Sequence, residues 1–347
     1  MSGNEATTHD GATADAGAPM PSEEVRRYFA DNPGDDTDGV SDIAVLREQT
    51  REVGLRVRGE LEPIGASTDG VIGGVHVRRY QPLELRRPAA VFLWIHGGGW
   101  MHGDLDVYEE VCRAFANALG CEVISVDYGL APEHPFPFAF NEIWAVTQEV
   151  AAEFPDVVLA GDSSGANLAA AVAIKARDEG ARIAVQLLIY PVLESSDATE
   201  FKQRFRTRYS PFVDQADFGE ATHDRIKWIW DVYVPDAELR ESPFATPMRA
   251  QTLRGVAPAV IVTAEHDILR GEGEAYAAKL RADGVPVNLL NFAGQIHGFL
   301  QMRGVLSDAG TALESAARAV SSHLTHEPAR SNQESTQHRQ RSHNVSH

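Results

Sequence analysis

Short apolar runs alternate with longer amphipathic stretches over most of the chain. From about Arg56 onward, a run such as Ala89–Ile95 is followed by a segment of helical length, and the pattern then repeats. Uninterrupted apolar runs of this length are typical of strands buried on both faces of a parallel sheet. The pattern therefore predicts an α/β fold with a mostly parallel central sheet flanked by helices.

Amphipathic stretches between these runs predict the helices. They include Phe140–Phe154 after a Pro-rich loop, Ala166–Glu179 and Gly273–Asp283, and a helical N-terminal piece spans about Ser22–Gly54. Because α/β folds of about 250 residues or more commonly form one unit, we expect a single domain over residues 21–324.

The segment 194–249 breaks the alternation. It is rich in aromatic and charged residues and lies between the strand-like runs Val185–Tyr190 and Ala259–Thr263. It predicts a helical cap that, with residues 22–54, covers the sheet edge and walls a substrate pocket. Its aromatic residues are candidates either to line that pocket or to attach the cap helices to the core. They are Phe212, Phe218, Trp228, Trp230 and Tyr233.

Both ends of the sequence are polar. Residues 1–20 and 325–347 are expected to be disordered tails. Residues 1–20 do not have the apolar run that a secretory signal or a membrane anchor needs. Apolar stretches elsewhere are of strand length, shorter than the roughly 20 residues that span a bilayer. We therefore expect no membrane-spanning segment.

Composition indicates the cellular compartment and argues against some classes of partner. Cys112 and Cys121 are the only cysteines, which fits a reduced, cytoplasmic protein. No zinc pattern or phosphate-binding loop is present, so no cofactor or metal is implied. A net charge of −19 argues against binding a phosphate backbone, so nucleic acid is not an expected partner. The sequence leaves open whether the chain forms a homo-oligomer.

One motif points to a nucleophilic serine. Residues 161–165 read Gly-Asp-Ser-Ser-Gly, follow an apolar run and precede an Ala-rich helical stretch. This is the strand, sharp turn and helix that lift a serine hydroxyl clear of a sheet, and the glycines let neighbouring backbone pass without a Cβ clash. The motif predicts a serine hydrolase with Ser163 as its nucleophile.

A second motif supplies hydrogen-bond donors. Residues 96–100 read His-Gly-Gly-Gly-Trp and directly follow a predicted strand. Preorganised N–H groups, here those of Gly98 and Gly99, can stabilise the negative oxygen that forms when a serine attacks an ester. A glycine triplet alone is equally typical of a flexible loop, and it is the serine motif downstream that favours the catalytic interpretation.

A candidate acid and a candidate base follow the serine motif. Hydrolases with this strand-turn-helix motif carry their catalytic residues in the chain order Ser, then Asp or Glu, then His. The run 259–264 leads to Glu265 and Asp267, and the run 287–292 is followed by a loop that carries His297. Asp267 is the predicted acid, and Glu265, which lies closer to the strand, is the alternative. His297 is selected as the base for its place in the order.

With these motifs together, the chain resembles the bacterial hormone-sensitive-lipase-like branch of the α/β-hydrolase superfamily, also described as the α/β-hydrolase fold-3 esterases. The resemblance covers Met20 to Leu324. It rests on residues 96–100, 127–137 (Asp-Tyr-Gly-Leu-Ala-Pro-Glu-His-Pro-Phe-Pro), 161–165, 267–273 and 297–299. It implies an α/β-hydrolase fold with a helical cap, a catalytic triad of Ser163, Asp267 and His297, and an oxyanion hole formed by Gly98, Gly99 and the N–H of Ser164.

The serine motif departs from the family pattern, which usually continues Ser-Ala-Gly-Gly, because Ser164 and Ala166 occupy two of those positions. The oxyanion donor at Ser164 is a backbone group. Its side chain is therefore expected to change the reaction rate rather than abolish activity.

The resemblance implies a lipase-like serine carboxylesterase that hydrolyses short to medium acyl esters of small molecules through an acyl-enzyme intermediate. An amidase or deacetylase with the same triad is one alternative. A non-catalytic ligand-binding relative on the same fold is the other. The sequence does not identify the physiological substrate.

The excess of acidic residues predicts a halophilic, salt-requiring protein. The sequence has 50 Asp and Glu residues but 31 Lys and Arg residues, of which four are lysines. Because salt screens the repulsion between surface carboxylates, we expect the thermal midpoint to rise from dilute buffer to molar KCl. A midpoint that stays flat in that comparison would favour an acidic mesophilic enzyme from an Arg-favouring genome.

Overall fold

An eight-stranded sheet runs through the centre of the computed structural model, which describes residues 20–33, 40–195 and 223–324. The strands are β1 (Ala66–Ile72), β2 (Val75–Gln81), β3 (Ala90–Ile95), β4 (Glu122–Val126), β5 (Asp156–Asp162), β6 (Val185–Ile189), β7 (Ala259–His266) and β8 (Val287–Ile296). Their order in space is β1-β2-β4-β3-β5-β6-β7-β8. β2 pairs antiparallel with both β1 and β4, and the six strands from β4 to β8 are parallel. The predicted fold class is confirmed.

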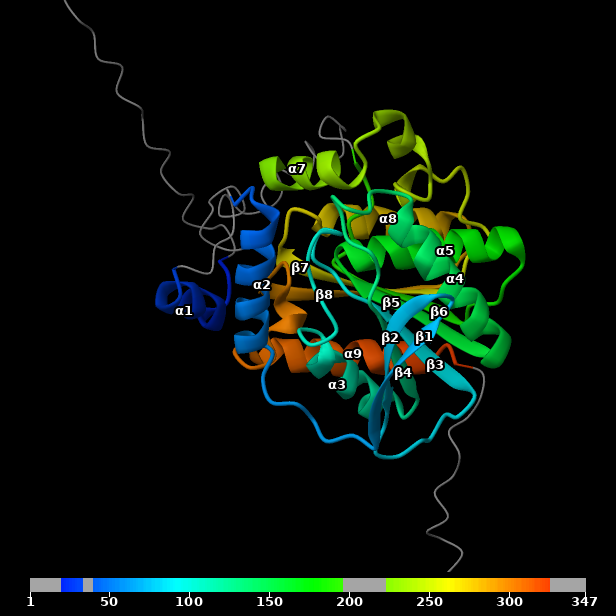
Figure 1. Ribbon diagram of the computed structural model, residues 1–347, viewed down its shortest axis with the longest axis horizontal. Coiled ribbons are helices and arrows are strands. Elements are labelled where there is room, and N and C mark those ends of the chain that lie inside the picture. The colour runs from blue at the N-terminus through cyan, green and yellow to red at the C-terminus, as the bar shows by residue number, and fades with distance from the viewer. Residues whose placement is uncertain (1–19, 34–39, 196–222, 325–347) are drawn as a thin grey trace, which may run out of the picture.

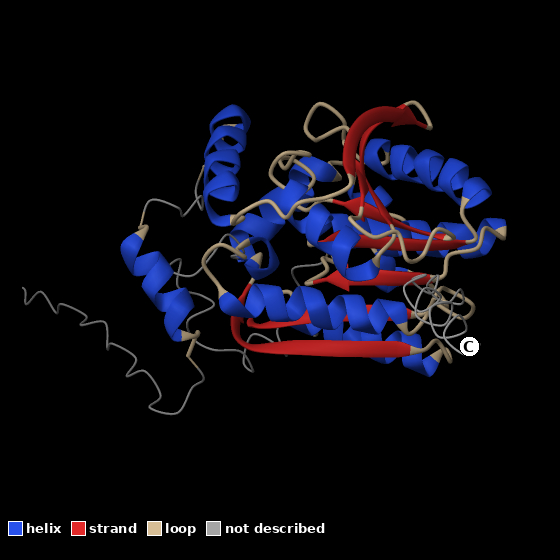
Figure 2. Cartoon of the chain, turned by 90° about the horizontal axis from the view of Figure 1, so that it is seen from below, coloured by secondary structure: helices blue, strands red, loops and turns tan. Residues whose placement is uncertain are grey.

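Helices cover both faces of the sheet (Figures 1 and 2). On one face lie α3 (Glu109–Leu119) and α9 (Ser307–Ser321), and on the other α4 (Phe138–Glu153), α5 (Ser164–Glu179) and α8 (Arg270–Ala282). The helices predicted at 140–154, 166–179 and 273–283 are α4, α5 and α8, each beginning two or three residues earlier than predicted.

The central strands face a core on each side. Along β3, Val91 and Leu93 pack in the cluster that includes α4, α5 and α8, whereas Phe92 and Trp94 pack in the cluster that includes α3 and α9. Since neither face meets water, every residue of β3 is buried and apolar. This two-sided burial explains the uninterrupted apolar runs in the sequence.

The described parts of the two segments that the sequence assigns to a cap are largely helical. The N-terminal piece forms α1 (Glu23–Asp31) and α2 (Ile43–Val57), and α7 (His223–Tyr233) precedes two 3-10 helices, η1 (Ala237–Glu241) and η2 (Pro247–Arg249). Residues 196–222, with Phe212 and Phe218, lie outside the described residues, as do the predicted tails apart from Met20.

The start of α5 lies directly against the end of β3. A Cβ atom on Gly165 would be 2.0 Å from the carbonyl oxygen of Ile95 and 2.5 Å from that of His96. Both contacts are with backbone, which cannot rotate away. Only glycine therefore fits at position 165 while α5 and β3 keep this close approach.

Replacing Gly165 with alanine is expected to destabilise the protein by at least about 2 kcal/mol, because the added methyl group forces α5 away from β3. Gly310→Ala in α9 is the matched control, since a Cβ there meets nothing within 4 Å. That change should leave stability unchanged or raise it by up to about 1 kcal/mol. Urea unfolding of both variants tests this expectation. Equal urea midpoints for Gly165→Ala and Gly310→Ala would contradict the packing argument.

Candidate active site

Ser163 lies at the turn between β5 and α5 in a strained backbone conformation. Its φ of 51° and ψ of −117° are rare for a residue with a side chain. Its N–H donates to the carbonyl of Ile189 at 2.8 Å, and a Cβ on Gly161 would lie 2.5 Å from the carbonyl carbon of Gly165. The two flanking glycines thus allow the sharp turn that projects Ser163 beyond the sheet.

His297 connects Ser163 to a buried carboxylate. Its Nε2 lies 2.9 Å from Ser163 Oγ, and its Nδ1 lies 2.8 Å from Asp267 Oδ2. Asp267 directly follows β7, is 1% exposed, and accepts the N–H of Leu269 on its other oxygen at 2.8 Å. The three side chains form a continuous hydrogen-bonded line with the geometry of a Ser-His-Asp triad.

Glu265, the alternative acid, makes a different contact. It lies within β7 and accepts the N–H of Gly294 at 2.7 Å. Of the two acidic residues considered from the sequence, Asp267 is the one that the structure brings to His297.

The glycine loop after β3 carries two N–H groups that no other described residue binds. Gly98 and Gly99 have φ values of 105° and 58°, and a Cβ on Gly98 would lie 2.2 Å from the carbonyl oxygen of His102. No hydrogen bond among the described residues takes the N–H of either glycine. On each side of the pair, however, an N–H is bound: Gly97 donates to Asp162 Oδ1 at 2.7 Å and Trp100 to Ser164 Oγ at 3.1 Å.

Asp162 is a fully buried carboxylate beside Ser163. Besides Gly97, its oxygens accept from Tyr108 Oη at 3.2 Å and from Gln301 Nε2 at 2.8 Å. Gln301 belongs to the 3-10 helix η3 (Phe299–Gln301), just after His297. Burial raises the pKa of Asp162 to about 6 in spite of these donors. Asp162 is not among the site residues predicted from the sequence. The only feature of the sequence that points to a role for it is its position directly before Ser163.

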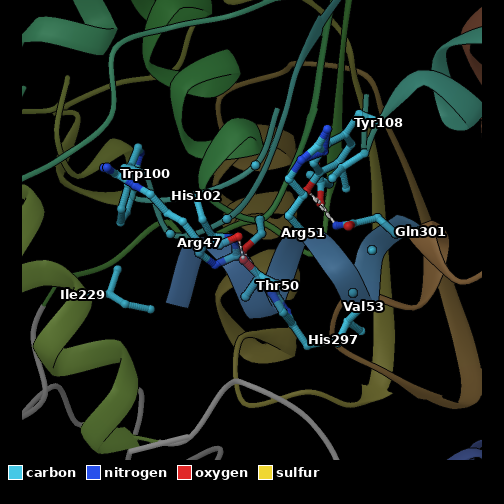
Figure 3. A pocket seen from close by; sticks show the side chains of 18 of the residues that line it. Arg47, Thr50, Arg51, Val53, Trp100, His102, Tyr108, Ile229, His297 and Gln301 are labelled. Atoms are coloured by element: carbon cyan, nitrogen blue, oxygen red, sulfur yellow. Dashed lines mark hydrogen bonds between the residues drawn. The ribbon is translucent and has the colours of Figure 1, made fainter. Parts of the chain in front are cut away.

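A cavity of about 280 Å³ opens at Ser163 and His297. Its walls come from the glycine loop, from α2 and from α7, and Figure 3 shows Ile229 and Trp100 on one side and Val53 and Gln301 on another. Residues of α2 and α7 that line it include Thr50, Arg51, Val53, Ile226, Ile229 and Trp230.

The described aromatic residues of the predicted cap support both interpretations. Trp230 lines the cavity. Tyr233 is buried and stacks on Trp100, with ring centroids 4.1 Å apart, so it attaches α7 to the glycine loop. Trp228 packs beneath the Arg225 guanidinium at 4.4 Å. Trp230 is itself only 1% exposed and packs on Trp100 with ring centroids 5.0 Å apart, so all three make packing contacts and Trp230 also contributes to the cavity wall.

Ion pairs attach α2 to the loop after Trp100. Arg51 bridges Asp104 at 3.1 Å and Asp106 at 2.8 Å. Arg47 pairs with Glu133 at 2.7 Å, and its hydrogen bonds hold the pKa of that carboxyl at about 2. Arg47 also donates to the carbonyl of Met101 at 2.8 Å. These contacts place one wall of the cavity against the loop that follows the two glycine donors.

Over the parts of the chain that the structure describes, no group of three or more His, Cys, Asp or Glu side chains is arranged to hold a metal ion. Within the same ranges, no helix has the length and apolar character needed to cross a membrane.

Comparison with known proteins places these motifs in one family. Residues 92–301 match the alpha/beta hydrolase fold family. This range includes the motifs at 96–100 and 161–165 as well as Asp267 and His297. The esterase LipI of Mycobacterium tuberculosis is 34% identical over 279 residues, covering 77% of this chain and 84% of LipI. Carboxylesterase NlhH of the same organism is 36% identical over 286 residues, covering 78% and 86%. An esterase structure from Pyrobaculum calidifontis has a TM-score of 0.78 at 32% identity, covering 88% of this chain and 99% of that one.

Replacing Asp162 with asparagine is expected to remove most of the loss of stability that the parent undergoes between pH 4 and pH 8. The folded state holds the pKa of this carboxyl at about 6, above its ordinary 3.8, so its ionisation lowers stability as the pH rises through that interval. A shift of about two units corresponds to about 3 kcal/mol, which a neutral asparagine avoids.

Urea titrations at several pH values test this expectation. Relative to the parent, the free energy of unfolding of Asp162→Asn should gain most at pH 8 and least at pH 4, where the parent carboxyl is protonated. This holds whatever constant offset the lost acceptor for Tyr108 and Gln301 adds. Asp178→Asn, at an exposed carboxyl, is the control and should show a much smaller gain. A gain that grows as the pH falls would contradict the stated cause.

Proposed function

This chain belongs to the alpha/beta hydrolase fold family, in its hormone-sensitive-lipase-like branch, and we propose that it is a serine carboxylesterase for esters of short to medium acyl chains. Relatives named as an esterase and a carboxylesterase support carboxylic ester hydrolysis. The observation that carries the proposed mechanism is the line of contacts from Ser163 Oγ through His297 to Asp267 at the cavity.

In this mechanism His297 acts first as a base and then as an acid. Its Nε2 takes the proton of Ser163 as Oγ attacks the ester carbonyl, while Asp267 orients the ring and stabilises its charged form. His297 then gives the proton to the leaving alcohol, which leaves an acyl group on Ser163. Water, activated by the same histidine, releases the acid and restores the serine.

Three backbone N–H groups are proposed to bind the negative oxygen. Those of Gly98 and Gly99 have no partner among the described residues. The third is that of Ser164, the first residue of α5, where an N–H has no carbonyl four residues earlier within the helix. Donors aimed at a developing oxyanion are each worth a factor of about 100 to 1000 in rate.

The size and lining of the cavity support a small or medium ester. Its volume of about 280 Å³ lies just below the range of about 300 to 1000 Å³ that is typical of sites for drug-sized ligands. Ile226, Ile229 and Trp230 give it an apolar wall suited to an acyl chain.

Hydrolysis of p-nitrophenyl esters from acetate to laurate, in molar KCl, tests the proposal. The parent is expected to prefer the shorter chains, and Ser163→Ala should lose the activity because it lacks the nucleophile. A folded parent that hydrolyses none of these esters would instead point to a selective amide hydrolase or a ligand-binding protein.

A matched pair of variants in the same assay tests the acid. Asp267→Asn should lower kcat by about 10³ to 10⁴, because an asparagine at this position favours the wrong histidine tautomer. Glu265→Gln removes a charge two residues away and is expected to change kcat little. The reverse ranking would assign the acid to Glu265.

A further inference from the structure

The residues on either side of the nucleophile contact the residues on either side of the two glycine donors. Before Ser163, Asp162 Oδ1 accepts the N–H of Gly97 at 2.7 Å. After it, Ser164 Oγ accepts the N–H of Trp100 at 3.1 Å. All four of these groups lie at the junction of β3, β5 and α5, and both accepting side chains are fully buried.

We propose that Asp162 and Ser164 are positioning residues that hold the glycine loop against Ser163, so that the N–H groups of Gly98 and Gly99 keep a fixed place relative to the attacking oxygen. We call these two hydrogen bonds the elbow clamp. The proposal rests on the function proposed above, because it concerns the stabilisation of the oxyanion in that reaction.

The glycine loop needs such contacts because its backbone is strained. Gly98, Gly99 and Trp100 are consecutive residues with positive φ, and for Trp100, at 59°, that conformation is unfavourable. The indole of Trp100 stacks on Tyr233, and its carbonyl accepts the N–H of Ala131 at 2.8 Å. These contacts fix the end of the loop toward α7, and the elbow clamp fixes both ends of the glycine pair to the nucleophile.

Asp162 also extends the clamp to the loop of the catalytic base. Its second oxygen accepts from Gln301, four residues after His297, and from Tyr108, which precedes α3. Tyr190, which follows β6, has its hydroxyl 3.5 Å from the same oxygen. A carboxylate makes stronger hydrogen bonds than a neutral acceptor and can accept from several donors at once, which explains an acid at a site where its burial is unfavourable.

The alternative is that these contacts stabilise the fold without affecting the reaction. The two interpretations differ in what a variant loses. A purely structural contact lowers the free energy of unfolding and leaves kcat of the folded protein intact. Loss of the elbow clamp should lower kcat, with little change in KM, since donors to the oxyanion act mainly on the transition state.

The experiment compares Ser164→Ala, Asp162→Ala and Asp162→Asn with the parent. Ser164→Ala removes one hydroxyl, so the test stands even if Asp162→Ala fails to fold. Asp162→Asn keeps a carbonyl oxygen for Gly97. Ser125→Ala is the matched control, because Ser125 is an equally buried serine within β4, outside the site described here.

Three quantities are measured: kcat and KM for p-nitrophenyl butyrate, the thermal midpoint, and the inhibition constant of an alkyl trifluoromethyl ketone. Serine adds to this ketone and creates a negative oxygen at the position of the oxyanion. The inhibition constant therefore reports how well the donors are placed, independently of the leaving group.

Ser164→Ala is expected to lower kcat about 5- to 10-fold, less than the roughly 100-fold loss of a whole donor, with KM changed by less than about twofold. Asp162→Ala should lower it by about 100-fold, near the loss of one donor, and Asp162→Asn should recover most of that loss. In each variant the inhibition constant of the ketone should rise by the factor by which kcat falls. Ser125→Ala should match the parent.

The proposal is overturned if folded Ser164→Ala and Asp162→Ala keep the parent kcat and inhibition constant, or if their loss appears in KM alone. It is also overturned if kcat falls while the inhibition constant stays at the parent value. An inactive parent would overturn the proposed function together with the clamp, and that result is seen before any variant is compared.

Discussion

Backbone packs against backbone where β3, β5 and α5 meet, with no space for a side chain between them. A Cβ on Gly161 would lie 2.5 Å from the backbone of Gly165, and one on Gly97 would lie 2.9 Å from the carbonyl oxygen of Asp162. This close approach fixes the end of β5 relative to the end of β3. Ser163 then leaves the sheet in the one direction that the turn allows. The positions of the glycine donors and of His297 relative to the nucleophile depend on this packing, because the loops that carry them begin at the same sheet edge.

Much of this arrangement could be predicted because it follows from local rules. Buried parallel strands read as apolar runs, and a catalytic loop begins where such a run ends, so Ser163, Asp267 and His297 could be located from strand ends and their order. Asp267 is predicted ahead of Glu265 because Glu265 lies closer to the strand, but the sequence keeps Glu265 as an alternative, since the end of a strand is difficult to place from sequence. β7 in fact continues through His266, so Asp267 is the first residue beyond it.

The contacts of Asp162 and of the cap aromatics could not be predicted in the same way. The donors to Asp162 come from Tyr108, before it, and from Tyr190 and Gln301, after it, and no spacing in the sequence relates these positions. Likewise, the role of Tyr233 depends on a ring more than a hundred positions earlier, Trp100. Such long-range contacts are determined by the tertiary fold, and they determine which polar and aromatic side chains serve the site.

The cavity walls and the reacting groups come from separate parts of the chain. α2 precedes the first strand of the sheet and α7 lies between β6 and β7, and neither helix supplies a side chain to the proposed triad or to the proposed elbow clamp. The reaction centre is built on tightly packed backbone, where nearly every change is costly. The walls consist of side chains on helices, such as Val53 and Ile229, which can change in size one at a time. Such a molecule can evolve a new substrate range by small steps while its chemistry stays constant.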